Sequence, residues 1–230
     1  MNDGPISRVQ HALRETLDQA TFDFEWFVGT REGVSIGGAG TGYCDLSVPL
    51  VATELVLDVL PDADGDIVTV RGFFAGESLY QRVGGDDPEW VELEVHGVGV
   101  TPVAAVHWLT GVVDARPTGP DSFAVEIDLD RAVRYSPAEL RDTIRLGLEE
   151  NHAGLSRLRV PAALSLGETG LVAKLDVEIP GLQDPDPGLS LPPRLVTLEL
   201  RPTGRRHIEL PVADTRMRVQ DFIDDLLRDD

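Results

Sequence analysis

The sequence predicts an α+β protein in which a few helices cover an antiparallel sheet. Apolar residues recur at every second position along several short runs, as they do in strands that bury one face. Glycine-rich and Asp-Gly turns separate these runs, which is typical of hairpins. Only a few segments follow the 3.6-residue helical period, and each has a single apolar stripe. We therefore expect each helix to lie with one side on the sheet.

The first helix and the first strand are predicted next to each other. Asp3 and Pro5 open the helix, because these residue types are favoured at helix starts. Its apolar stripe consists of Ile6, Val9, Leu13, Leu17 and Ala20. The period then changes to two over residues 22–28, which predicts a strand.

A meander of short strands is predicted next. Residues 33–42 form a glycine-rich turn or strand edge, and residues 43–59 form one long strand or two. The Asp-Gly pair within residues 61–66 supplies the positive φ angles of a tight hairpin turn. Further strands are expected at residues 67–74, 78–83 and 90–95.

Two more helices are predicted in the middle of the chain. Thr101 and Pro102 begin a short helix that Gly111 closes. After a strand at residues 123–129, Ser136 to Glu139 form a capping box that opens a helix ending near Gly154.

The clearest hairpin spans residues 158–181, around a Gly-Glu-Thr-Gly turn at residues 167–170. Before the turn, Leu164 and Leu166 lie on one face. After it, the same alternation gives Leu171, Ala173, Leu175, Val177 and Ile179. This hairpin is the centre of the predicted sheet.

The C-terminal part is predicted to contain a loop, a strand and a last helix. Residues 183–193 carry four prolines and form the loop, and residues 195–200 form the strand. An acidic amphipathic helix is expected at about residues 218–228. Since no clear linker divides the chain, residues 1–230 are predicted to form a single domain.

Charge and composition exclude some classes of function. With 40 acidic and 20 basic residues the net charge is −20, which argues against binding to nucleic-acid phosphates or anionic lipid surfaces. Cys44 is the only cysteine, so no internal disulfide can form. No export signal is recognisable and no run approaches about 18 apolar residues, so the chain as written is expected to be cytoplasmic. The cell envelope is the expected location if the sequence is a trimmed form.

Five segments, in this order and spacing, resemble a known family: Ala12–Thr16, Gly76–Tyr80 with Trp90 beyond it, Pro102–Leu109, Phe123–Leu129 and Val160–Leu175. The chain looks like the actinobacterial branch of the LolA-like superfamily, the LppX and LprG type of lipid-carrying lipoproteins. The resemblance implies a curved, half-open antiparallel sheet, or half-barrel, with helices on its concave face. It also implies an apolar cavity between them that holds acyl chains.

The cavity-lining side chains are expected to be the apolar and aromatic ones on the inward positions. They are Phe24, Trp26, Trp90, Val106, Trp108, Leu109 and Leu175. For the three tryptophans, plain core packing is the competing and more common interpretation.

No sequence motif makes a convincing catalytic or metal site. Ser35 lies in a Gly-x-Ser-x-Gly pattern, but the following glycines cannot start the helix that a hydrolase nucleophile requires. Asp62, Asp64 and Asp66 lack the glycine and glutamate positions of a calcium loop. The five histidines are scattered without metal-ligand spacing, and His107, beside Trp108, is the most interesting of them. Neither a metal nor a cofactor is therefore expected.

Two functions from different classes follow. The first is non-enzymatic binding of a lipid or other hydrophobic molecule. The alternative is a cytoplasmic protein-interaction domain of the same fold that docks a basic protein partner through its acidic surface. An enzyme built on Ser35 is the weakest hypothesis.

Overall fold

The computed structural model describes residues 4–30, 38–46, 53–59, 68–75, 78–83, 89–94, 102–151, 154–183, 190–191, 193–207, 209–218 and 221. Twelve strands form one sheet, in the order β14-β6-β5-β4-β3-β2-β1-β13-β10-β9-β8-β7. Their bounds are β1 Thr21–Thr30, β2 Gly38–Asp45, β3 Thr53–Val59, β4 Val68–Ala75, β5 Ser78–Val83, β6 Glu89–Glu94, β7 Val112–Gly119, β8 Ser122–Asp128, β9 Arg159–Leu166, β10 Val172–Ile179, β13 Arg194–Pro202 and β14 Thr215–Arg218. A separate small pair joins β11 (Leu182–Gln183) to β12 (Ser190–Leu191).

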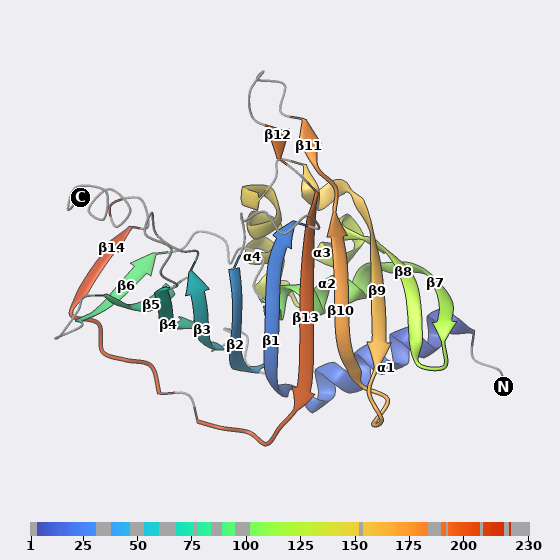
Figure 1. Cartoon of the computed structure of the whole chain (residues 1–230), viewed down its shortest axis with the longest axis horizontal. Helices are drawn as coiled ribbons and strands as arrows, with labels where there is room; N and C mark the ends of the chain where they lie inside the picture. Colours follow the sequence, from blue (N-terminus) through green and yellow to red (C-terminus); the bar gives the residue numbers. More distant parts are fainter. Residues whose placement is uncertain are drawn as a thin grey trace.

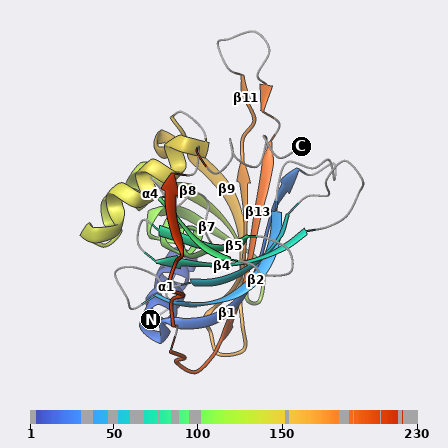
Figure 2. The same cartoon turned by 90° about the vertical axis from the view of Figure 1, so that its left-hand side faces the viewer.

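The sheet is strongly curved and antiparallel almost throughout. The exception is β14, which lies parallel to β6 at one edge. In Figure 2 the strands turn from upright at β13 to nearly horizontal at β4 and β5. The predicted half-open antiparallel sheet is therefore confirmed.

Strand β13 joins the two halves of the sheet. On one side it pairs with β10, which continues through β9 and β8 to β7. On the other side it pairs with β1, which continues through β2 to β6. The first and one of the last strands of the chain are therefore neighbours in the middle of the molecule (Figure 1).

The helices lie on the concave face, as predicted. They are α1 Pro5–Gln19, α2 Pro102–Trp108, α3 Leu129–Tyr135 and α4 Ala138–Asn151, with short 3₁₀ turns η1 Leu109–Gly111 and η2 Leu155–Arg157. Helix α1 packs against β7 and β10, while α3 packs against β8, η1 and α2. Figure 1 shows α1 crossing below the strands and α2 to α4 behind them.

A buried threonine ties α1 to the sheet. The Thr16 hydroxyl donates to the Ala12 carbonyl within the helix (2.7 Å) and accepts the N–H of Val172 from β10 (2.9 Å). Ala20 then adopts a left-handed conformation (φ 64°) and donates its N–H to the Thr16 carbonyl. This closes the helix and starts β1 in the next residue.

The central hairpin forms as predicted, except that its register contains an irregularity. The β9–β10 pairing shifts between Val172 and Lys174. Val172 is therefore buried, whereas the predicted inward residues Leu171 and Ala173 are half-buried. A bulge of this kind changes which face the side chains on its two sides occupy, so simple alternation assigned Ala173 wrongly, while Leu171 still packs against the core.

Strands β7 and β14, the small β11–β12 pair and helix α3 were not predicted. Strand β14 carries too few apolar residues to signal a strand, and the β11–β12 pair falls at the predicted loop of residues 183–193. Helix α3 begins at Leu129, which the alternation assigned to the preceding strand. The Asp128 carboxylate caps this helix by accepting the Arg131 N–H at 2.9 Å.

Gly111 permits η1 to approach the start of α3 closely, since a Cβ at this position would lie 2.2 Å from the Asp128 carbonyl oxygen.

Residues 43–59, predicted to form one long strand or two, belong to two strands, β2 and β3. The predicted turn at residues 61–66 and the helix at about residues 218–228 lie outside the described residues, apart from Arg218, which ends strand β14, and Asp221. The same holds for Ser35 and for Asp62, Asp64 and Asp66.

Candidate functional site

The concave face is tightly filled where the helices cover it. Along β8, β9, β10 and β13 the inward side chains are fully buried and belong to one apolar core with α1, α2 and α3. Phe123, Leu164, Leu175 and Leu198 are among the largest of them. On the opposite, convex face the same strands carry half-buried or exposed polar residues, such as Lys174 paired with Glu199.

Along β1 the side chains on the concave face are buried less completely. Phe22 and Phe24 are fully buried, but Trp26 and Val28, on the same inward face, are only half-buried. On the neighbouring strand β2, Gly42 lies opposite Phe24 and Gly40 opposite Trp26. Both glycines are half-buried and contribute no side chain to the concave face. We call Trp26, Val28, Gly40 and Gly42 the glycine stretch.

The side chains of helix α2 that the structure describes are buried on every side. Residues 104–109 are all buried, which is unusual for a short helix in a two-layer fold. Within it, neither ring nitrogen of His107 nor the indole Nε1 of Trp108 has a hydrogen-bond partner among the described residues. Burial lowers the pKa of His107 to about 4, so the imidazole is uncharged at neutral pH.

Six of the seven predicted cavity residues come together. Phe24, Val106, Trp108, Leu109 and Leu175 belong to the apolar core, and Trp26 packs against it. The strand pairing separates Trp90 from these six. Counted across β1 to β6, Trp90 lies on the convex face, where its ring packs against Phe73 at a centroid distance of 5.6 Å.

Sequence reasoning did not single out Gly40 and Gly42. The alternation of Gly38, Gly40 and Gly42 was the available signal, since every second residue of a strand faces the same side. The sequence instead predicts a turn or a strand edge over residues 33–42, because this segment is rich in glycine.

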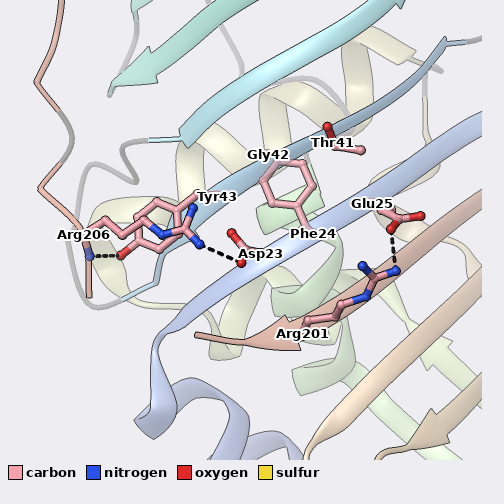
Figure 3. A pocket seen from close by; sticks show the side chains of 8 residues that line it. All are labelled: Asp23, Phe24, Glu25, Thr41, Gly42, Tyr43, Arg201 and Arg206. Carbon is pink, nitrogen blue, oxygen red and sulfur yellow. Dashed lines mark hydrogen bonds and ion pairs between the residues drawn. The ribbon is translucent and has the colours of Figure 1, made fainter. Parts of the chain in front are cut away.

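One hollow of about 370 Å³ lies around β1 and β2 and is lined mainly by charged and polar groups. The Arg206 guanidinium lies over the Tyr43 ring and pairs with Asp23 at 2.8 Å, and Arg201 pairs with Glu25 (Figure 3). Since these charges neutralise one another, the hollow offers little to an apolar molecule.

Catalytic and metal chemistry find no support in the described part of the chain. Burial raises the pKa of the Cys44 thiol to about 12, with Asp45 adding to the effect, so it is not a nucleophile at neutral pH. Within the described ranges, no three His, Cys, Asp or Glu side chains are grouped as a metal ion requires. None of the described helices has both the length and the hydropathy to cross a bilayer.

Comparison with solved structures identifies the architecture. The chain is similar to the crystal structure of LprF from Mycobacterium bovis over 90% of its own length and 96% of that chain, with 12% identity and a TM-score of 0.54. The chain has the LolA-like fold. At this identity the likeness establishes the LolA-like fold alone, and it agrees with the family resemblance of the sequence.

A LolA superfamily protein from Nitrosomonas europaea also matches, over 87% of this chain and 94% of that one, with 8% identity and a TM-score of 0.34. No model of a known protein family matches the chain. No curated protein matches it either.

Proposed function

We propose that the protein binds a lipid or another hydrophobic molecule between the concave face of its LolA-like sheet and the helices, without altering it chemically. The observation that carries this proposal is the glycine stretch. There, two apolar side chains are half-buried next to two glycines, whereas the rest of the described inner face of β1, β8, β9, β10 and β13 is almost fully buried.

Such a stretch suits an extended apolar chain. Gly40 and Gly42 place no side chain above the backbone of β2, and Trp26 and Val28 offer apolar surface beside it. Each methylene group that leaves water contributes about 0.8 kcal/mol, so affinity should rise with acyl chain length. In this proposal Trp26 contacts the ligand directly, and Phe24, Val106, Trp108, Leu109 and Leu175 form the wall behind it.

Native mass spectrometry of protein prepared without detergent tests the proposal. We expect a mass above that of the bare chain, which organic extraction removes. A bare mass, combined with no uptake of lipid from neutral vesicles, would contradict the proposal. It would leave the acidic docking domain as the hypothesis to examine, by salt-dependent binding of a basic partner.

A paired substitution tests the location. Gly40→Val with Gly42→Val places two side chains on the concave face, and we expect the bound mass to fall strongly. Thr41→Val is the matched control, since Thr41 lies between them on the exposed convex face. If the glycines instead serve to seat the rings of Phe24 and Trp26, the double variant will unfold at lower temperature without selective loss of ligand.

A further inference from the structure

The hollow of about 370 Å³ around β1 and β2 has no part in the proposed function. Its charged and hydroxyl side chains on these strands are those of Asp23, Glu25, Thr41 and Tyr43. They stand at alternate positions, opposite one another across the two strands, and so face away from the helices. Phe24 also lines the hollow, but its ring belongs to the apolar core. A molecule bound on this convex side is therefore distinct from a ligand of the glycine stretch.

Arg206 forms a fixed wall of the hollow. Its backbone N–H donates to the Tyr43 hydroxyl at 2.9 Å, and its guanidinium lies 5.1 Å from the centre of the Tyr43 ring. The guanidinium also pairs with Asp23 at 2.8 Å (Figure 3). Since three contacts hold this arginine, its remaining donors are already in place for a ligand.

Two ion pairs leave hydrogen-bonding groups unused. Arg206 pairs with Asp23 and Arg201 with Glu25, in each case through Nη2 and one carboxylate oxygen. Within the described part of the chain, the other side-chain nitrogens of both arginines and the second oxygen of each acid make no further hydrogen bond. The hollow thus offers donors and acceptors side by side.

The balance of charge favours an uncharged ligand. An anion would meet two carboxylates and the field of a chain with net charge −20, whereas a cation would meet two guanidinium groups. A hydroxyl group donates and accepts, so it fits both kinds of group without displacing either ion pair. Hydrogen bonds to charged partners are also stronger than those between neutral groups.

An exposed aromatic ring lies further along the same face of β1. Phe27 is 42% exposed and follows Glu25 by two positions, which places both side chains on the convex face. Its ring lies over Gly29, since a Cβ at Gly29 would be 2.3 Å from the ring's Cζ. At about 3.3 Å per residue, the strand extends over about 13 Å from Asp23 to Phe27. Polar groups and apolar ring therefore follow one another along one strand.

We propose that the hollow and the Phe27 ring form a binding site for an uncharged oligosaccharide on the convex face of the sheet. Sugar hydroxyls accept hydrogen bonds from the two guanidinium groups and donate to the two carboxylates. The apolar face of a neighbouring sugar unit stacks on Phe27. The site lies outside the proposed hydrophobic site, so it stands or falls independently of that proposal.

Titration calorimetry with three neutral trisaccharides, maltotriose, cellotriose and mannotriose, tests the site. We expect at least one of them to bind. Trigalacturonic acid, an acidic trisaccharide, should bind at least about tenfold more weakly than the best neutral one, because it brings negative charge to the two carboxylates. Binding of none of the neutral probes at millimolar concentration overturns the proposal, and so does preferred binding of the acidic one.

Substitutions of exposed side chains locate the bound sugar. Arg201→Gln should raise the Kd about tenfold, because it removes charge-assisted hydrogen bonds. Phe27→Leu keeps an apolar side chain but removes the ring, and it should raise the Kd about threefold. Arg159→Gln is the matched control, since it removes an equally exposed arginine whose partner on the same face is Glu126, at 3.2 Å. Equal affinity in all three variants would place the sugar elsewhere and overturn the site.

A measurement on the unaltered protein gives a direct view of the contact. In a sample with ¹³C-labelled phenylalanine rings, the bound trisaccharide should shift the signals of Phe27, which are identified by their loss in Phe27→Leu. The ring of Phe123, buried in the core at 2% exposed, should keep its signals. Unmoved Phe27 signals in the sugar-saturated protein contradict the proposal.

Discussion

The helix-covered part of the sheet and the glycine stretch are built on the same alternating strand pattern, yet they differ in what fills the concave side. In the first, inward leucines, valines and phenylalanines of β8, β9, β10 and β13 meet the helices and are fully buried. In the second, β2 offers glycines, and its neighbours Trp26 and Val28 stay half-buried. The first region provides the buried apolar core, and the second is the place where we propose that a ligand binds.

The largest expected effect tests the packed region. Leu175→Ala should lower the free energy of unfolding by about 2–5 kcal/mol, because it leaves a cavity among fully buried neighbours. Val28→Ala in the glycine stretch should cost less than about 1.5 kcal/mol, because Val28 already lies partly in solvent. Urea denaturation of both variants measures the difference, and similar losses would remove the distinction between the two regions.

Acid should weaken the packed region through His107. Its pKa is about 4 in the folded protein and 6.5 when unfolded, so the unfolded chain binds the extra proton between these values. Stability is therefore expected to be complete above pH 6.5 and to fall by about 3 kcal/mol as pH drops to 4.

Unfolding curves between pH 7 and pH 4 measure this dependence for His107→Leu and for His11→Gln, whose imidazole is exposed in the folded protein. In His107→Leu the free energy of unfolding should no longer fall by this amount between pH 7 and pH 4, whereas His11→Gln should keep the decrease. An unchanged slope in His107→Leu would contradict the prediction.

The buried threonine that links α1 to β10 should contribute less. Thr16→Val keeps the shape of the side chain but leaves the Val172 N–H without its acceptor, at a cost of about 1–3 kcal/mol. Thr41→Val, with the same chemical change on the exposed convex face, should be nearly neutral. Thermal unfolding of the pair measures the contrast, and equal melting temperatures would show that the helix is held by packing alone.

The smallest effect is expected on the convex face. Arg206→Ala removes an exposed ion pair with Asp23 and a contact with the Tyr43 ring, so it should cost less than about 1 kcal/mol and less still in high salt. A loss as large as that of Leu175→Ala would mean that the segment after β13 stabilises the sheet as strongly as the core does.

Most strands and three helices could be predicted, because their periodicity is local to the sequence. The face of Trp90 could not be, since it depends on the register of every strand between β1 and β6. Helix α3 could not be predicted, because Leu129 continues the apolar alternation of β8. The structure shows that the Asp128 carboxylate caps a helix that begins at Leu129. The nitrogen atoms of His107 and Trp108 that lack a partner among the described residues could not be predicted either. Whether a buried nitrogen finds a partner depends on its three-dimensional surroundings.

The position of β13 has a consequence for folding. Strand β1 emerges first from the ribosome, but its partner, with Phe22 opposite Pro202, is synthesised after eleven other strands. The chain up to β12 can therefore form hairpins and dock helices, yet it leaves β1 and β10 as open edges until β13 inserts between them. Pairings of such large sequence separation are slow to form, and the waiting edges invite association with other chains. We expect refolding to be slow and to yield aggregates as protein concentration rises, with insertion of β13 as the limiting step.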